Sequence, residues 1–105
     1  MWILRGSGTD GEVLIFRIPQ GAVKTVGRAQ RADIIVDATL VSRLHCRVEA
    51  SRDTLAVIDL SSTNGTFVND KRVEHAALAI GDRLRVGRVE LKVERTPDAK
   101  RKAKA

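Results

Sequence analysis

The chain has 105 residues, a formal net charge of +6 and one cysteine, and its composition is 43% hydrophobic but only 3% aromatic. This length suits a single domain whose core needs no metal ion or disulfide. Cys46 has no partner for an internal disulfide, and the opening MWILRGSG is too short an apolar run for a signal peptide or membrane span, so we expect an intracellular protein without membrane contact.

Short apolar or alternating runs recur along the chain, each bounded by turn residues. In order, they occupy residues 2–4, 12–18, 23–27, 33–36, 45–50, 54–60, 66–68, 71–73, 82–87 and 89–94. Asn69-Asp70 and Gly87-Arg88 fill two-residue gaps between runs, where such φ-tolerant residues are typical of hairpin turns. No stretch predicts a long amphipathic helix. The pattern predicts an all-β fold, a two-sheet antiparallel β-sandwich within one domain over residues 1–96.

The last residues, 97–105, have the sequence PDAKRKAKA, with four basic residues and one acidic residue. We expect a disordered basic tail, because a charge run of this kind is usually solvated. The chain contains only three aromatic residues, Trp2, Phe16 and Phe67, which are too few for a base-stacking platform. The pattern also lacks a recognition helix. We therefore expect no specific binding of nucleic acid.

Three polar clusters interrupt the strand pattern, at residues 27–33, 41–45 and 61–69. All three fall between strands, so a sandwich can bring them together at one end. Arg28 offers a planar fork of N–H donors, Ser42 and Thr63 offer hydroxyls, and the Gly- and Asn-containing loops offer backbone N–H groups. These donors suit a tetrahedral oxyanion, and phosphate fits best because its bonds to Arg are charge-assisted.

The same clusters resemble a known family. Gly27-Arg28, then Ser42-Arg43-Leu44-His45, then residues 63–69 (TNGTFVN) are similar to the GR, SxxH and NGxxxN signature of the forkhead-associated domain. Each motif is weak alone, but the ordered set, over roughly residues 2–95, is specific. The resemblance implies a sandwich of about eleven short strands whose loops bind phosphothreonine peptides. It therefore implies a cofactor-free module, monomeric as an isolated domain, that recruits a phosphorylated partner protein in Ser/Thr kinase signalling.

The resemblance also implies binding roles by position. Arg28 and Ser42 would contact the phosphate, assisted by Thr63 and by the backbone N–H of Arg43. Asn64 would bond the peptide main chain beside the phosphothreonine, since its amide can both donate and accept.

Other signature positions would support the site. Gly27 would permit the turn that presents the phosphate-binding Arg, and His45 would be mainly structural, bonding across loops to hold Ser42 in place. Gly65 would serve a backbone position with φ > 0. Asn69 would tie its hairpin turn to a neighbouring loop.

Two further residues are candidates for contact with the peptide on either side of the phosphothreonine. Arg31 shares a loop with Arg28, so its cation could touch acidic residues that flank the phosphate. Leu40 lies two residues before Ser42, where it could influence which peptides are selected.

Two alternative functions can be weighed on the sequence. Catalysis would use Ser42 as nucleophile and His45 as base, with Asp37 or Asp59 orienting the imidazole. The chain lacks a G-x-S-x-G elbow, a P-loop and a metal-ligand cluster, so we predict no catalytic residues, no metal site and no enzyme activity. The second alternative is a scaffold of the same fold that binds proteins through its sheet faces without phosphate. The joint presence of Arg28, Ser42 and Asn64 is evidence against it.

Overall fold

The computed structural model describes residues 1–8 and 10–96; the expected basic tail, residues 97–105, lies outside the described residues. No helix occurs in the described ranges, and thus none there is long and apolar enough to cross a membrane. The eleven strands are β1 (Trp2–Ser7), β2 (Val13–Ile18), β3 (Val23–Gly27), β4 (Ile34–Ile35), β5 (Cys46–Ala50), β6 (Leu55–Asp59), β7 (Thr66–Val68), β8 (Lys71–Val73), β9 (His75–Leu78), β10 (Arg83–Val86) and β11 (Val89–Arg95).

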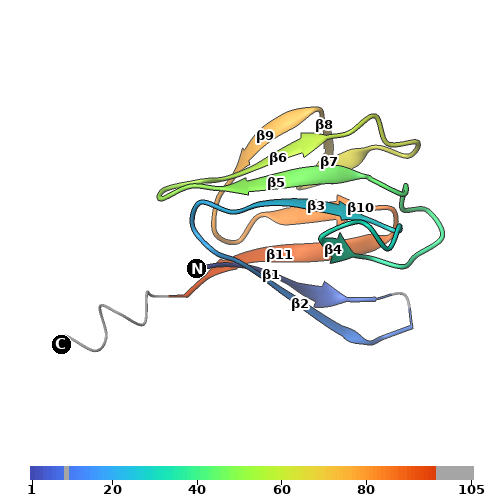
Figure 1. Cartoon of the computed structure of the whole chain (residues 1–105), viewed down its shortest axis with the longest axis horizontal. Helices are drawn as coiled ribbons and strands as arrows, with labels where there is room; N and C mark the ends of the chain where they lie inside the picture. The colour runs from blue at the N-terminus through green and yellow to red at the C-terminus, as the bar shows by residue number, and fades with distance from the viewer. Residues whose placement is uncertain (9, 97–105) are drawn as a thin grey trace.

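The strands form two stacked sheets (Figure 1). The order in the six-stranded sheet is β2-β1-β11-β10-β7-β8, and the order in the five-stranded sheet is β4-β3-β5-β6-β9. The predicted all-β sandwich is confirmed. One detail differs from a purely antiparallel pattern, because the short β4 runs parallel to β3, pairing Ile34 with Val26.

The strand pattern in the sequence omits β9, whose residues His75–Leu78 read HAAL. Alanine is depleted in strands, so this segment gives little alternating signal. It forms a strand because it pairs with β6, with His75 opposite Ile58 and Leu78 opposite Leu55. Both predicted two-residue hairpins are present, and each uses positive φ angles: 51° and 70° at Asn69 and Asp70, and 59° at Gly87.

The core lies between the sheets and consists mainly of aliphatic side chains. Leu4, Leu84 and Leu91 from the six-stranded sheet meet Val48 and Val57 from the five-stranded sheet, and all are fully buried. Burying each such side chain contributes roughly 1.5–3 kcal/mol. The result is a rigid support for the loops β3–β4, β4–β5 and β6–β7, which gather at one end of the sandwich (Figure 1).

Candidate functional site

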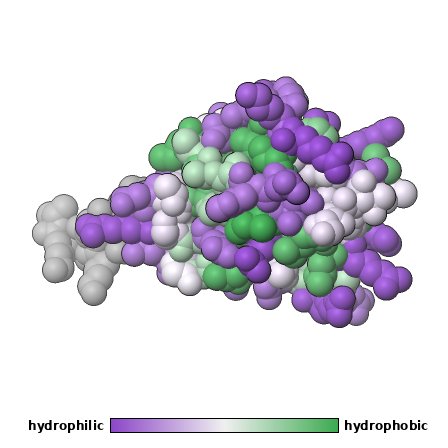
Figure 2. Space-filling view, turned by 90° about the horizontal axis from the view of Figure 1, so that it is seen from above, coloured by the Kyte–Doolittle hydropathy of each residue, from purple (hydrophilic) through white to green (hydrophobic). Residues whose placement is uncertain are grey.

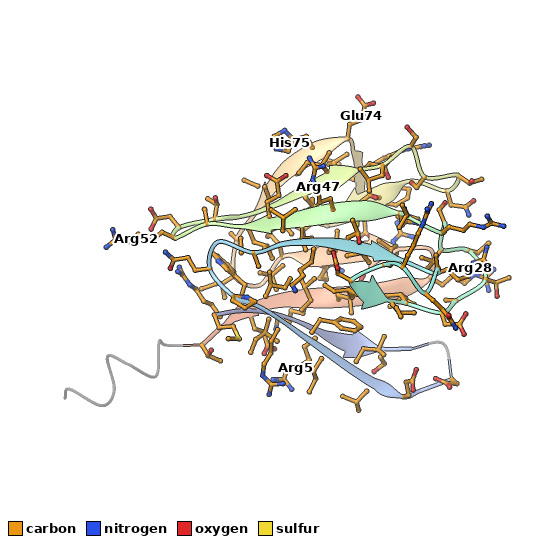
Figure 3. All side chains as sticks on the ribbon, viewed as in Figure 1. Arg5, Arg28, Arg47, Arg52, Glu74 and His75 are labelled. Atoms are coloured by element: carbon orange, nitrogen blue, oxygen red, sulfur yellow. The ribbon has the colours of Figure 1, made fainter. Side chains whose placement is uncertain are left out.

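Arg28 begins the loop that follows β3, and it is fastened to the β4–β5 loop through both backbone and side chain. Its backbone N–H donates to the carbonyl of Ser42 at 3.0 Å. Its Nε donates to the carbonyl of Val41 at 3.0 Å. Within the described residues the guanidinium forms no ion pair, so its terminal nitrogens remain available. Figure 3 places Arg28 at the loop end of the sandwich and Arg52 at the opposite end.

Gly27 allows two backbones to approach closely. A Cβ at this position would lie 2.0 Å from the carbonyl oxygen of Arg43, nearer than any real contact. The φ angle of Gly27 is not positive, so the backbone there does not require glycine. This differs from the expectation that Gly27 permits a turn. Its role is to let the β3–β4 and β4–β5 loops touch.

Ser42 and Arg43 present donors from the β4–β5 loop beside Arg28. The Ser42 hydroxyl oxygen accepts a hydrogen bond from the backbone N–H of Thr63 at 3.0 Å, which leaves the hydroxyl proton free to donate. The backbone N–H of Arg43 has no acceptor in the described part of the chain. The Thr63 side chain is exposed on the β6–β7 loop. The structure thus brings the four predicted phosphate-binding residues together.

His45 is fully buried and links the β4–β5 loop to the β6–β7 loop. Its Nδ1 lies 3.0 Å from the backbone nitrogen of Ser42, and its Nε2 lies 2.8 Å from the carbonyl oxygen of Gly65. A backbone N–H only donates and a carbonyl only accepts, so Nδ1 is the acceptor and Nε2 carries the proton. The ring is therefore neutral.

The β6–β7 loop is held over the site by several bonds. Asn64 donates from Nδ2 to the carbonyl of Leu40 at 3.0 Å, which leaves its Oδ1 and its second amide proton free. Gly65 has φ = 89°, and a Cβ there would lie 2.8 Å from Nε of Arg72. A side chain at this position would thus be strained by the backbone, and it would also displace the exposed Arg72 side chain.

Asp59 and Ser62 also build the site, although sequence reasoning missed their role. The Asp59 carboxylate accepts bonds from the Ser62 hydroxyl (2.5 Å), the Ser62 backbone N–H (3.1 Å) and the Thr66 hydroxyl (2.7 Å). The Ser62 oxygen in turn accepts the N–H of Gly65 at 3.0 Å. The available signal was an Asp three residues before a Ser at a strand end, a common turn pattern.

Burial opposes ionisation of Asp59, but the hydrogen bonds from Ser62 and Thr66 outweigh it and hold the pKa of Asp59 below its usual value. The neighbouring Cys46 behaves oppositely, because burial raises the pKa of its thiol to about 12. Cys46 is therefore a core side chain and not a nucleophile.

Asn69 joins the β7–β8 hairpin to the β9–β10 turn. Its Nδ2 donates to Asp82 at 3.1 Å, and its Oδ1 accepts the backbone N–H of Arg83 at 3.0 Å. These contacts lie at the start of β10, at the end of β7 opposite the β6–β7 loop, so Asn69 joins two turns away from the phosphate-binding group.

The two predicted flank residues lie on two different loops, β3–β4 and β4–β5. Arg31 is exposed in the β3–β4 loop, whose end is fixed by Asp33 through bonds to the backbone and hydroxyl of Thr25 at 2.9 and 3.1 Å. These bonds lower the pKa of Asp33. Leu40 is 39% exposed in the β4–β5 loop.

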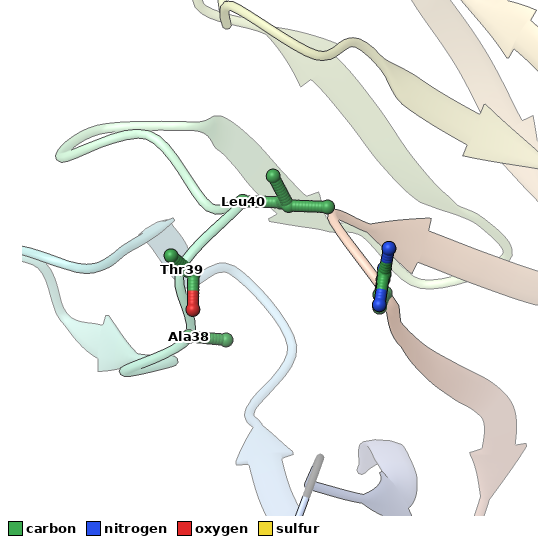
Figure 4. A pocket seen from close by; sticks show the side chains of 4 residues that line it. Ala38, Thr39 and Leu40 are labelled. Carbon is green, nitrogen blue, oxygen red and sulfur yellow. The ribbon is translucent and has the colours of Figure 1, made fainter.

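Leu40 borders a hollow of about 370 Å³ (Figure 4). Its walls come from the β4–β5 loop and the β10–β11 turn; the lining residues are Ala38, Thr39, Leu40 and Arg88. Sequence reasoning placed Arg88 in a hairpin turn but did not connect it with Leu40, because 48 residues separate them, from 40 to 88. The hollow combines an apolar wall with one cation.

The family model of the FHA domain matches residues 24–87, a range that contains every predicted site residue. The chain belongs to the FHA domain family. Among curated relatives, the glycogen accumulation regulator GarA of Mycobacterium tuberculosis is 37% identical over 70 residues, 67% of this chain and 43% of GarA. The FHA domain-containing protein FhaA of the same organism is 36% identical over 82 residues, 78% of this chain and 15% of FhaA. The match thus spans less than half of either relative.

Solved FHA domains have the same fold. The FhaA FHA domain, in a crystal structure complexed with the intracellular domain of Rv3910, superposes with a TM-score of 0.79 at 32% identity, covering 90% of this chain and 100% of that one. A second FHA domain, from a study of phosphothreonine-dependent FHA domain interactions, also gives 0.79 at 32% identity, covering 91% and 99%. The structural similarity at 32% identity therefore agrees with the family assignment.

Proposed function

We propose that this FHA domain is a phosphothreonine-dependent peptide-binding module that recruits a phosphorylated partner protein in Ser/Thr kinase signalling. The observation that carries the proposal is the arrangement around Arg28: its guanidinium is oriented by the Val41 carbonyl, beside a hydroxyl proton of Ser42 and a free N–H of Arg43. The similarity to a solved FHA domain from a study of phosphothreonine-dependent FHA domain interactions also supports it.

The phosphate would be held by donors from three loops. Arg28 would supply charge-assisted bonds worth about 1.5–3 kcal/mol each, whereas the hydroxyls of Ser42 and Thr63 and the Arg43 amide would supply nearer 1 kcal/mol each. Arg28 therefore dominates. A flexible peptide loses conformational freedom on binding, so the net affinity would be modest. We expect micromolar dissociation constants, which correspond to a binding free energy on the order of −8 kcal/mol.

Asn64 would bind the peptide main chain next to the phosphothreonine. One of its amide protons is already bonded to Leu40 and fixes the side chain, while Oδ1 and the second proton can pair with a peptide N–H and C=O. Such pairing recognises backbone geometry and not a particular side chain. Preference for particular neighbours must come from elsewhere.

Residues flanking the phosphothreonine would meet two surfaces. The exposed Arg31 would favour an acidic neighbour on its side. The hollow bordered by Leu40 and Arg88 would accept a side chain with an aliphatic stem, and an acidic tip would pair with the guanidinium.

The proposal includes no catalysis and no cofactor. Both ring nitrogens of His45 are bonded to backbone groups, and Nδ1 takes the N–H of Ser42 and not its hydroxyl, so the ring cannot activate that hydroxyl as a base. All site groups come from one chain, which makes a single chain the binding unit and a monomer the expected state in dilute solution. The ligand is a phosphoprotein made by intracellular kinases, so we place the domain inside the cell, with no nucleic-acid or membrane partner.

A degenerate peptide array with a central phosphothreonine, phosphoserine or unmodified threonine tests this function. The proposal expects signal on phosphothreonine peptides and background on unmodified copies. Equal signal on all three would contradict it and would favour a scaffold that binds proteins independently of phosphate. The residue preferences on the array would also show whether acidic neighbours are selected.

A further inference from the structure

The two sheets end in four edge strands, β2 and β8 in one sheet and β4 and β9 in the other. Edge strands present unpaired backbone groups, and folded proteins protect them by shortness, charge or proline. β4 has two residues, β8 has three of which two are cationic, and β9 has four. β2 has six residues, VLIFRI, with one charge and no proline. Among the described residues, β2 is the long edge without such protection.

The free edge of β2 carries both backbone donors and apolar side chains. The N–H of Gly8 donates to the Glu12 carbonyl at 2.7 Å, so the backbone of Glu12 points toward β1. Because these directions alternate along a strand, the backbone groups of Val13, Ile15 and Arg17 point away from β1. Val13 is 71% exposed and Ile15 is 38% exposed. The same residues therefore offer hydrogen bonds and apolar contact.

The β2 edge and the strands β8 and β9 lie at opposite margins of the molecule (Figure 1). Figure 1 shows β2 along the margin of the molecule, away from β8 and β9. Figure 2, seen from the side of β8 and β9, shows hydrophilic side chains interspersed with smaller hydrophobic areas.

We propose that β2 pairs with β2 of a second copy of this chain, antiparallel, so that one sheet continues through two molecules. The charges select this direction: Asp10 and Glu12 precede the strand and Arg17 lies near its end. Antiparallel pairing keeps the two Arg17 side chains apart and the two acidic starts apart, whereas parallel pairing would place each beside its like.

The two faces of the sheet determine which residues meet. Leu14 and Phe16 pack against the core, so Val13, Ile15 and Arg17 share the outer face. Side chains on one face must stay on that face in a continuous sheet, so outer residues pair with outer residues. A two-fold axis at the middle of the strand then places Ile15 beside Ile15 of the second copy.

Pairing through one strand is weak, because it buries less than the roughly 1,200 Å² of stable interfaces. The chain is therefore a monomer in dilute solution and pairs when concentrated or tethered. The loops that carry Arg28 and Asn64 connect other strands, β3 to β4 and β6 to β7, and they remain accessible to a ligand in the pair. Two copies held together would bind a doubly phosphorylated ligand with higher avidity if the proposed function is correct.

Analytical ultracentrifugation of the full chain, from about 10 μM to about 1 mM, tests the pairing. The weight-average mass of the wild type should rise with concentration, and that of Ile15→Lys should stay at the monomer value. Val23→Lys is the matched control, since Val23 is 55% exposed on the other sheet, and it should behave as wild type. A wild type that stays monomeric throughout overturns the proposal, as does equal loss of association in both variants.

Mixing two variants tests that the contact is copy to copy. Ile15→Glu alone and Ile15→Lys alone should each stay monomeric, whereas their equimolar mixture should associate, because opposite charges then face each other across the pair. Amide exchange gives an independent reading: the N–H groups of Val13, Ile15 and Arg17 should exchange more slowly as concentration rises. A mixture that remains monomeric, or exchange that is independent of concentration, refutes the pairing. Unchanged thermal melting shows that the variants are folded.

Discussion

The ring of His45 accepts a hydrogen bond from the backbone N–H of Ser42, while the hydroxyl of the same serine accepts the N–H of Thr63. The imidazole thus fixes where Ser42 lies without engaging the group that would contact a ligand. With Nε2 bonded to Gly65, one buried side chain sets the separation of two loops. The arrangement positions the donors of Ser42 and Thr63 relative to one another.

Replacing Arg28 by Ala should remove phosphopeptide binding and leave the fold intact. Each charge-assisted bond lost weakens binding roughly 10–150-fold, so losing two or more takes a micromolar ligand out of the range that calorimetry detects. Isothermal titration calorimetry with a phosphothreonine peptide measures the loss. Arg52→Ala, at the opposite end of the sandwich, is the control and should bind normally. Undiminished binding by Arg28→Ala is incompatible with the proposed site.

Replacing His45 by Ala should lower both stability and binding, in contrast to Arg28→Ala. The change removes two hydrogen bonds from a fully buried position and leaves a cavity, which costs about 2–4 kcal/mol of unfolding free energy. Denaturant titration measures the stability, and calorimetry well below the melting temperature measures the affinity. A variant with reduced stability and wild-type affinity would show that the loops keep their positions without the ring.

The sequence predicts much of this site because each motif residue has a local signature. The two-residue hairpins at Asn69-Asp70 and Gly87-Arg88 follow from turn chemistry, and the sandwich follows from alternating runs. The strand β9 was missed because its two alanines pair with β6 only in the tertiary structure. Gly27 was assigned to a turn because a sequence cannot show that the Arg43 carbonyl lies 2.0 Å from where a Cβ would be. The hollow between Leu40 and Arg88 also depends on a long-range contact.

Replacing Gly27 by Ala should destabilise the domain by about 2–4 kcal/mol, because the added methyl group forces two loops apart. Phosphopeptide affinity should fall as well, since the same loops carry Arg28 and Arg43. Gly8→Ala is the matched control: its nearest neighbour would be the flexible Asp10 side chain at 3.2 Å, and its φ is not in the left-handed region. Melting temperature and calorimetry on both variants distinguish a close approach from a general effect of losing glycine.

Replacing Asp59 by Asn should loosen the β6–β7 loop in a way that depends on pH. The folded pKa of Asp59 is lowered, so its ionised form stabilises the fold above the unfolded pKa of about 3.9, and that contribution is lost as pH falls through the folded value. At pH 7 the variant keeps one carbonyl acceptor but sets an amide donor against the donors of Ser62, at a cost of about 1–3 kcal/mol.

The difference in unfolding free energy between wild type and Asp59→Asn should therefore shrink as pH falls below about 4, because protonation then removes the charge from the wild type too. Urea titrations at several pH values measure this convergence. Asp53→Asn, an exposed residue in the β5–β6 turn, is the control and should follow the wild type throughout. A constant difference between wild type and Asp59→Asn from pH 7 to pH 3 would mean that the Asp59 charge does not hold the loop.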